Sequence, residues 1–309
     1  MLTPQHHPAP GAAPAETFDA GKVIIEHVSN SGIDHPLIHL PKIMGIDFSV
    51  TKHVLMLWIV SLVLFTVVTW TVRRYVRQQR LLPTGLMNVL ETVVEFVRDT
   101  MVEPAVGRKW VRTWTPLILT LFLFIFTANI VGLIPIFDVL GLVDRFMLHS
   151  SPDSFIAKVL HGGTTATANY NVTAGLATIT FGAIILAGTK AHGFVKHWMN
   201  LAPKGLAWPL YFLLIPIEIM GMFVRPFALT MRLAANMTGG HIAILAMLSF
   251  VFLFAQIGGT PTGIGVGLLF SVPLSVAISG LEIIVVLVQA YVFSLLTAVF
   301  IGMAIHAHH

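Results

Sequence analysis

Four ionisable side chains in an otherwise apolar stretch are the residues of this chain best suited to chemistry. Between residues 206 and 309 the only Asp, Glu, Lys or Arg side chains are Glu218, Arg225, Arg232 and Glu282. A charge at the centre of a membrane-spanning helix costs about 2.5–3.5 kcal/mol on insertion scales, so it usually faces a partner or a water-filled path. The pattern therefore predicts machinery that moves ions.

Three of these charges share one helix face. Glu218, Arg225 and Arg232 are spaced by seven residues, which leaves them within about 40° of one another on an α-helix. Asn236 continues the stripe one turn on. The simpler interpretation is an ion pair of Glu218 with either arginine that locks helices together. A single ion pair with Glu218 needs only one arginine, so we expect this helix face to have a functional role.

A second polar pair is predicted from the geometry of a helical hairpin. The turn sequence at residues 258–263 parts two long apolar stretches, and His241 lies about as far before it as Glu282 lies after it. Antiparallel helices place both at similar depth, and the same count sets Arg232 opposite Gln289. His241 is nine residues from Arg232, so it points about 180° away from the arginine face. A histidine beside a carboxylate could relay protons, although membrane histidines more often serve in helix packing.

The composition places these residues in an integral membrane protein. Of 309 residues, 56% are hydrophobic and only 10% are charged, against about 25% charged in soluble domains. Five apolar stretches reach the roughly 20 residues that one helical span needs. They cover residues 54–72, 116–136, 172–189, 209–256 and 264–307. The predicted fold class is all-α with five membrane-spanning helices, in which the last two are long, strongly tilted or bent, and form a hairpin.

Two further regions complete the predicted organisation. Residues 1–50 are expected to be a mostly loose, extracytoplasmic N-terminal segment, and residues 51–309 a single membrane domain. Polar residues recur at helical spacing over about 85–106, which predicts an amphipathic helix. It would lie on the cytoplasmic membrane surface or pack against a partner.

The distribution of basic residues orients the chain. Eight Lys and Arg lie in 73–112 and three in 190–204, against three in 1–53 and two in 137–170. The positive-inside rule then puts the N-terminus outside and, after five crossings, the C-terminus in the cytoplasm. These charges flank apolar spans as topology determinants, so the net charge of +4 does not indicate nucleic-acid binding.

Several chemistries are excluded or disfavoured. The chain has no cysteine, hence no thiolate metal site, and no Walker-type loop, so nucleotide catalysis must lie in a partner. Of 14 histidines only His241 lies deep within a span, which argues against a haem subunit, and we expect neither cofactor nor metal. An ion-coupled secondary transporter or a stand-alone proton channel remains the alternative. Transporters, however, usually carry paired repeats with broken helices in both halves.

At these residues the chain resembles subunit a of the membrane (Fo) sector of bacterial F-type ATP synthases. The resemblance covers roughly residues 35–309. Its strongest elements are RPFALTMRLAANM at 225–237, Glu218 fourteen residues before Arg232, and QAYVF at 289–293, with weaker echoes in NIVGLIP at 129–135 and NVT at 171–173.

The resemblance implies a non-catalytic stator subunit that couples proton translocation to ATP synthesis or hydrolysis elsewhere in the complex. Arg232 would be the family's essential arginine beside the c-subunit rotor ring, and Arg225 a secondary basic residue on its face. Glu218 would line an inner half-channel. The implied partners are the c-ring, the peripheral-stalk b subunits, the rest of the complex and membrane lipid, in a bacterial plasma membrane.

The resemblance also implies an outer half-channel. It would be lined by His241 and Glu282, with Asn236 and Gln289 as polar neighbours of the arginine. A familiar family pattern has Glu at the position of His241 and His at that of Glu282, so the pair is exchanged here and the acid–base couple is kept. Protons are the expected ion.

Overall fold

The fold is an assembly of long helices in a computed structural model that describes residues 19–28, 42–43, 46–47, 49–78, 82–133, 165–199 and 208–306. The long helices are α2 (Lys52–Gln78), α5 (Val111–Leu133), α8 (Tyr170–His192), α10 (Trp208–Gly258) and α12 (Val272–Ile305). The shorter elements are α1 (Ala20–Val28), β1 (Lys42–Ile43), β2 (Ile46–Asp47), α3 (Leu86–Phe96), η1 (Val97–Val102), α4 (Glu103–Val106), η3 (Ala166–Ala168), α9 (Phe194–Met199), α11 (Thr260–Val266) and η4 (Gly267–Ser271).

Five helical stretches are long and apolar enough to cross a membrane within the described ranges, namely α2, α5, α8, α10 and the run Thr260–Ile305 from α11 to α12. The predicted all-α membrane fold is therefore confirmed, with β1 and β2 adding only a minimal antiparallel pair. Residues 134–136 and 307 of the predicted spans lie outside the described residues.

The two C-terminal helices form the predicted hairpin, with a tighter turn than expected. Gly259 is the only residue between α10 and α11, and its φ of 83° lies in the left-handed region that favours glycine. Pro261 is the second residue of the returning helix, within the first turn, where its missing N–H costs no hydrogen bond. The predicted turn over 258–263 is thus mostly helix.

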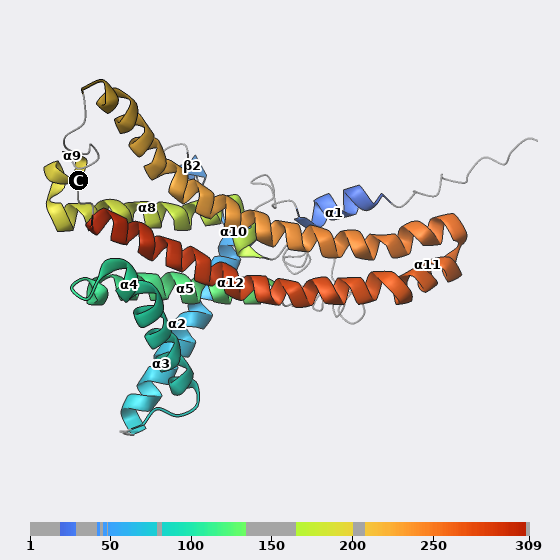
Figure 1. The fold of residues 1–309 in the computed structure, drawn as a ribbon. Coiled ribbons are helices and arrows are strands. Elements are labelled where there is room, and N and C mark those ends of the chain that lie inside the picture. Colours follow the sequence, from blue (N-terminus) through green and yellow to red (C-terminus); the bar gives the residue numbers. More distant parts are fainter. Residues whose placement is uncertain are drawn as a thin grey trace, which may run out of the picture.

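Helix α10 is far longer than one span. Its 51 residues extend about 75 Å at the usual rise per residue, and Pro216 and Pro226 lie inside it. It runs beside α12 near the hairpin and leans away from it over its first turns (Figure 1). Bending of this kind is expected where proline removes a backbone hydrogen bond.

Helix α12 lies at the centre of the assembly, where it packs against α5, α8 and α10. Ile118, Ile125, Leu233, Phe293 and Ile301 are fully buried in this core. The end of α12 is also fixed by two contacts between a histidine side chain and a backbone carbonyl. His192 Nε2 of α8 lies 2.9 Å from the Ile305 carbonyl, and His306 Nε2 lies 3.2 Å from the Val106 carbonyl.

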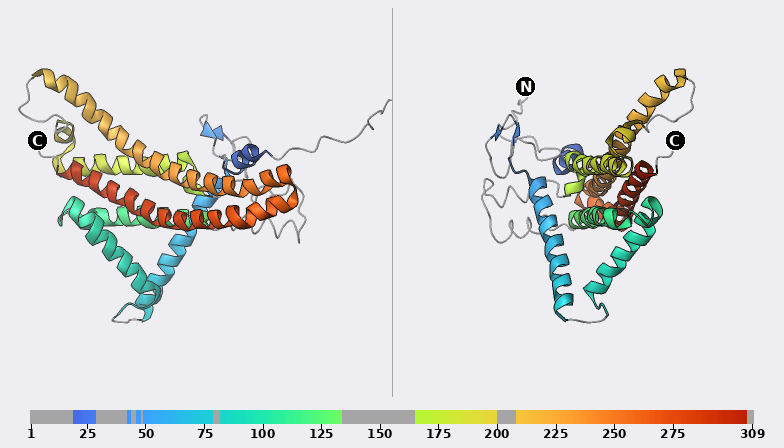
Figure 2. Two further views of the ribbon diagram at one scale, coloured as in Figure 1. Left: turned by 45° about the vertical axis from the view of Figure 1, so that its right-hand side comes forward. Right: turned by 90° about the vertical axis from the view of Figure 1, so that its left-hand side faces the viewer.

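The predicted amphipathic helix over 85–106 is a helical run with two different halves. Helix α3 has no buried residue, whereas Val97, Met101 and Val106 in η1 and α4 are fully buried against α5 and α12. The second half begins with the π-helical turn η1, which directly follows α3. Helices α2 and α3 meet at one end and diverge as a V (Figure 2). The second half therefore packs as a core element.

The N-terminal segment departs from the prediction where it is described. Residues Ala20–Val28 form the helix α1, which packs against α10, in a stretch for which we expected loose chain. Ile24 is half-buried in this helix, whereas Ile25 is exposed. Residues 1–18 lie outside the described residues.

Candidate functional site

A hydrogen-bonded chain of three side chains crosses from η3 to the C-terminal hairpin. His241 of α10 has its Nδ1 atom 3.0 Å from Glu282 Oε1 of α12 and its Nε2 atom 2.8 Å from Thr165 Oγ1. The Glu282 side chain is 3% exposed and that of His241 is 23% exposed. The histidine and glutamate that the depth count placed together are therefore in contact, and both imidazole nitrogens have a partner.

The second carboxylate oxygen of Glu282 differs from the first in having no partner in the described part of the chain. Glu282 Oε2 is buried and has no hydrogen-bond partner among the described residues. A buried carboxylate oxygen without a donor is costly when the group is ionised. Glu282 thus has one oxygen bonded to His241 and one without a partner in the described part of the chain.

Two glycines make room for this chain. A Cβ atom on Gly240 would lie 2.6 Å from Glu282 Oε1, and one on Gly132 would overlap the Thr165 side chain. Glycine inside a helix costs up to about 1 kcal/mol relative to alanine, so these positions trade helix stability for close approach. The adjacent glycines at 239 and 240 are a sequence signal for such an approach that the prediction did not use.

Thr165 is the candidate residue that the sequence analysis missed. It lies 76 residues before His241, and no local pattern connects the two. The segment that carries it is held from two sides: Thr167 Oγ1 donates to Asn129 Oδ1 of α5 at 2.6 Å, and Thr238 Oγ1 of α10 donates to the Ala168 carbonyl at 3.4 Å. Asn129 is buried. This contact gives a structural role to the first residue of the NIVGLIP motif at 129–135.

The arginine face is separate from this chain. Asn236 Nδ2 donates to Gln289 Oε1 at 2.9 Å, and Gln289 is buried. Gln289 was expected opposite Arg232, but its bond is to the residue one turn further on. Arg232 itself is exposed, and within the described part of the chain it has no hydrogen bond, ion pair or ring contact.

The second arginine is held by its own helix and by α12. Arg225 Nη2 lies 3.5 Å from Glu218 Oε1, and the Arg225 guanidinium lies 5.8 Å from the centre of the Phe300 ring. The internal ion pair that we considered as the simpler interpretation is therefore present for Arg225. It does not include Arg232, so the two arginines have different surroundings on one face.

The exposed neighbours of Arg232 in the sequence are apolar. Phe227 and Met231 of α10 are both exposed large hydrophobic side chains. A guanidinium is always charged in proteins, and a charge within a membrane usually faces a partner or a water-filled path.

Comparison with known proteins decides the family. The family model described as "ATP synthase A chain" matches residues 54–302. The chain belongs to the ATP synthase subunit a family. It is 38% identical to "ATP synthase subunit a 2" of Chlorobium luteolum, over 98% of this chain and 80% of that protein. It is 35% identical to "ATP synthase subunit a" of Anaeromyxobacter dehalogenans, over 99% of this chain and 75% of that protein.

Membership of the subunit a family states what kind of protein this is. The chain is a non-catalytic, proton-translocating subunit of the Fo sector and a multi-pass membrane protein of a bacterial ATP synthase. The expected family is thus confirmed. The roles of individual residues stay predictions.

Proposed function

We propose that this subunit a conducts protons along two offset half-channels that are separated by Arg232 beside a c-subunit rotor ring. The observation that carries the proposal is the contrast between the two polar sets. Thr165, His241 and Glu282 form a hydrogen-bonded chain, whereas Arg232 is exposed without a partner among the described residues. One set is suited to relaying protons and the other to meeting a counter-charge.

In this proposal Arg232 acts as a barrier between the half-channels. A guanidinium keeps its proton in proteins, so Arg232 cannot carry one between the half-channels. It attracts a deprotonated rotor carboxylate and repels a proton that would pass directly between the half-channels. Asn236 and Gln289 are its polar neighbours one turn on, held together by their own hydrogen bond.

The outer half-channel runs through the His241 chain. A neutral imidazole has one donor and one acceptor nitrogen, and the Thr165 hydroxyl both donates and accepts. A proton that enters at one nitrogen of His241 can therefore leave from the other. Glu282 accepts it, and its second oxygen, to which no described residue donates, offers the next position.

The inner half-channel is assigned to the start of the arginine face. The side chains of Glu218 and Arg225 are 41% and 30% exposed although they are paired. A partly exposed pair is weakly held, which leaves Glu218 able to exchange a proton with a rotor carboxylate or with water.

The partners and orientation follow from the same proposal. The c-ring covers the exposed arginine face, the peripheral-stalk b subunits hold this stator, and the rest of the complex makes or hydrolyses ATP. The N-terminus lies outside and the C-terminus in the cytoplasm, since basic residues concentrate in 73–112 and 190–204. We infer a bacterial plasma membrane because the relatives that the chain matches are bacterial.

The substitution Glu282→Gln tests the outer half-channel. It keeps the size of the side chain and removes its acid, so we expect ATP-driven proton pumping in inverted vesicles to slow by roughly tenfold or more, with the complex still assembled. Glu95→Gln is the matched control, since Glu95 is an exposed carboxylate on α3. Normal pumping by assembled Glu282→Gln enzyme would remove Glu282 from the path.

A further inference from the structure

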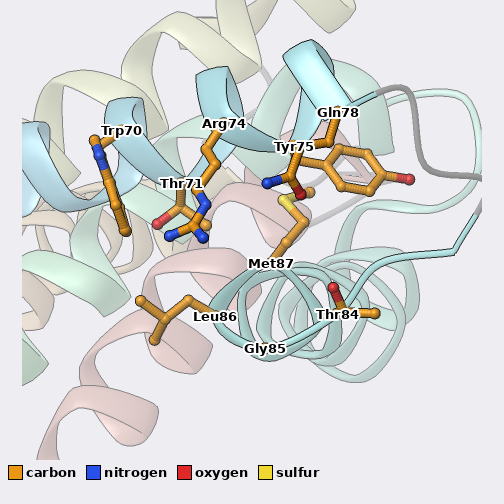
Figure 3. A pocket seen from close by; sticks show the side chains of 9 residues that line it. All are labelled: Trp70, Thr71, Arg74, Tyr75, Gln78, Thr84, Gly85, Leu86 and Met87. Carbon is orange, nitrogen blue, oxygen red and sulfur yellow. The ribbon is translucent and has the colours of Figure 1, made fainter.

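A cavity with both polar and apolar lining residues lies between α2 and the start of α3, away from both polar sets described above. It has a volume of about 240 Å³, and Trp70, Thr71, Arg74, Tyr75, Gln78 and Met87 are among the residues that line it (Figure 3). A neighbouring hollow shares Trp70, Arg74 and Gln78 with it and adds Arg73 and Arg77. Three arginines thus border one continuous region, and no acidic residue lines either part.

The cavity contains a hydrogen-bonding group that the described residues leave unused. Thr71 is 5% exposed, and its Oγ1 atom is buried without a hydrogen-bond partner in the described ranges. In Figure 3 the guanidinium of Arg74 extends beside Thr71. The same guanidinium lies 5.2 Å from the centre of the Trp70 ring, a cation–π arrangement that fixes its position. A hydroxyl and a positioned guanidinium on one cavity wall suit an anionic oxygen.

The position of the cavity identifies the source of that anion. Apolar side chains on the preceding turns of α2 are exposed, including Trp58, Leu62 and Phe65, and the run of arginines follows directly. Tryptophan and arginine at the end of a span mark the depth of lipid headgroups. A ligand with an anionic head at Arg74 and acyl chains along α2 matches both parts of this surface.

We propose that the cavity between α2 and α3 binds the phosphate of an anionic phospholipid, with its head at Thr71, Arg73, Arg74 and Arg77 and its acyl chains along the exposed face of α2. A bilayer supplies such lipids continuously, and juxtamembrane basic residues attract them. A bound lipid fills the V between α2 and α3 and gives the Thr71 hydroxyl an acceptor. The bound lipid would hold α2 and α3 against the helical core of the subunit.

Photolabelling of the assembled complex tests the proposal. The complex is reconstituted in phosphatidylcholine vesicles that contain a small fraction of photoactivatable phosphatidylglycerol, and the labelled peptides are mapped. We expect labelling within residues 65–87. Arg74→Gln should lower it about fivefold, the usual effect of one basic residue near an anionic surface. Thr71→Val, which keeps the side-chain shape, should lower it by a similar factor.

The control is Arg112→Gln, which removes an exposed arginine at the start of α5 that borders neither hollow. It should leave labelling unchanged. Equal labelling by photoactivatable phosphatidylcholine, loss of labelling on addition of inorganic phosphate, or equal effects of Arg74→Gln and Arg112→Gln would each overturn the proposal. So would a crosslink from a photoreactive residue at Gln78 to another subunit in place of lipid labelling.

Discussion

At the scale of single residues, the proposed proton path depends on how closely Glu282 approaches His241. Glu282 Oε1 lies 3.0 Å from His241 Nδ1, and the absence of a side chain at Gly240 permits this approach. Any atom added at residue 240 must push the carboxylate away or turn it toward another partner. The distance between the two proposed proton carriers is thus controlled by a third residue that cannot carry protons.

The substitution Gly240→Ala is therefore expected to impair proton transfer while it leaves α10 intact. Displacement of a reacting group by about 1 Å can cost up to a hundredfold in rate, so we expect pumping to fall roughly tenfold to a hundredfold. The helix itself should gain up to about 1 kcal/mol. Gly280→Ala is the matched control, because a Cβ there meets no atom within 4 Å. Equal pumping by both assembled variants would contradict the assigned contact.

The residues of the site differ in how far the sequence could predict them. The pairing of His241 with Glu282 follows from counting residues to the hairpin turn, because helix rise and antiparallel packing are regular. Thr165 could not be predicted, because it reaches His241 only through the packing of η3 against α5 and α10. A long-range contact of this kind depends on tertiary structure that no local pattern encodes.

At the scale of elements, α12 connects the site to the rest of the fold. It contributes Glu282 and Gln289 to the two polar sets, and it packs against α5, α8 and α10. Its last turns approach α4 most closely at Gly302, where a Cβ atom would overlap the carbonyl oxygen of Ala105. Backbone oxygens cannot move aside as flexible side chains do, so this contact sets the spacing of α12 and α4.

We therefore expect Gly302→Ala to destabilise the fold. Forcing an extra methyl group into a packed interior typically costs about 1–3 kcal/mol, which should appear as a lower midpoint of thermal unfolding for the detergent-solubilised complex. Gly182→Ala on α8 is the control, since a Cβ there meets nothing within 4 Å. If the two variants unfold at the same temperature, the close packing of α12 on α4 is wrong.

The elements were predicted in outline, and their irregularities were not. Hydropathy and length found the five spans because a bilayer demands about 20 apolar residues per crossing. The single-residue turn at Gly259 and the π-helical turns η1 and η4 were missed. One inserted residue in a helix leaves no change of hydropathy to detect. Counted from the observed turn at Gly259, His241 lies 18 residues before it and Glu282 lies 23 residues after it. The returning side of the hairpin therefore contains more residues, and these include α11 and η4 at its closed end.

At the scale of the whole molecule, the protein keeps apart two polar sets that the proposed mechanism requires, namely the hydrogen-bonded side chains at His241 and the arginine face at Arg232. The buried chain at His241 is made of groups that exchange protons, and the exposed face at Arg232 carries a charge that does not. No described residue supplies a counter-charge to Arg232. We propose that a rotor carboxylate supplies it, and that this subunit acts on its rotor through Arg232.

ATP-driven proton pumping in inverted vesicles by Arg232→Ala enzyme tests that claim most directly. Assembly is checked on the same preparation, and Arg112→Gln serves as the control for loss of a positive charge elsewhere on the chain. We predict an assembled complex in which Arg232→Ala abolishes coupled pumping and Arg112→Gln retains it. Retained pumping by assembled Arg232→Ala enzyme would contradict the account, because the arginine would then be dispensable to the separation of the two half-channels.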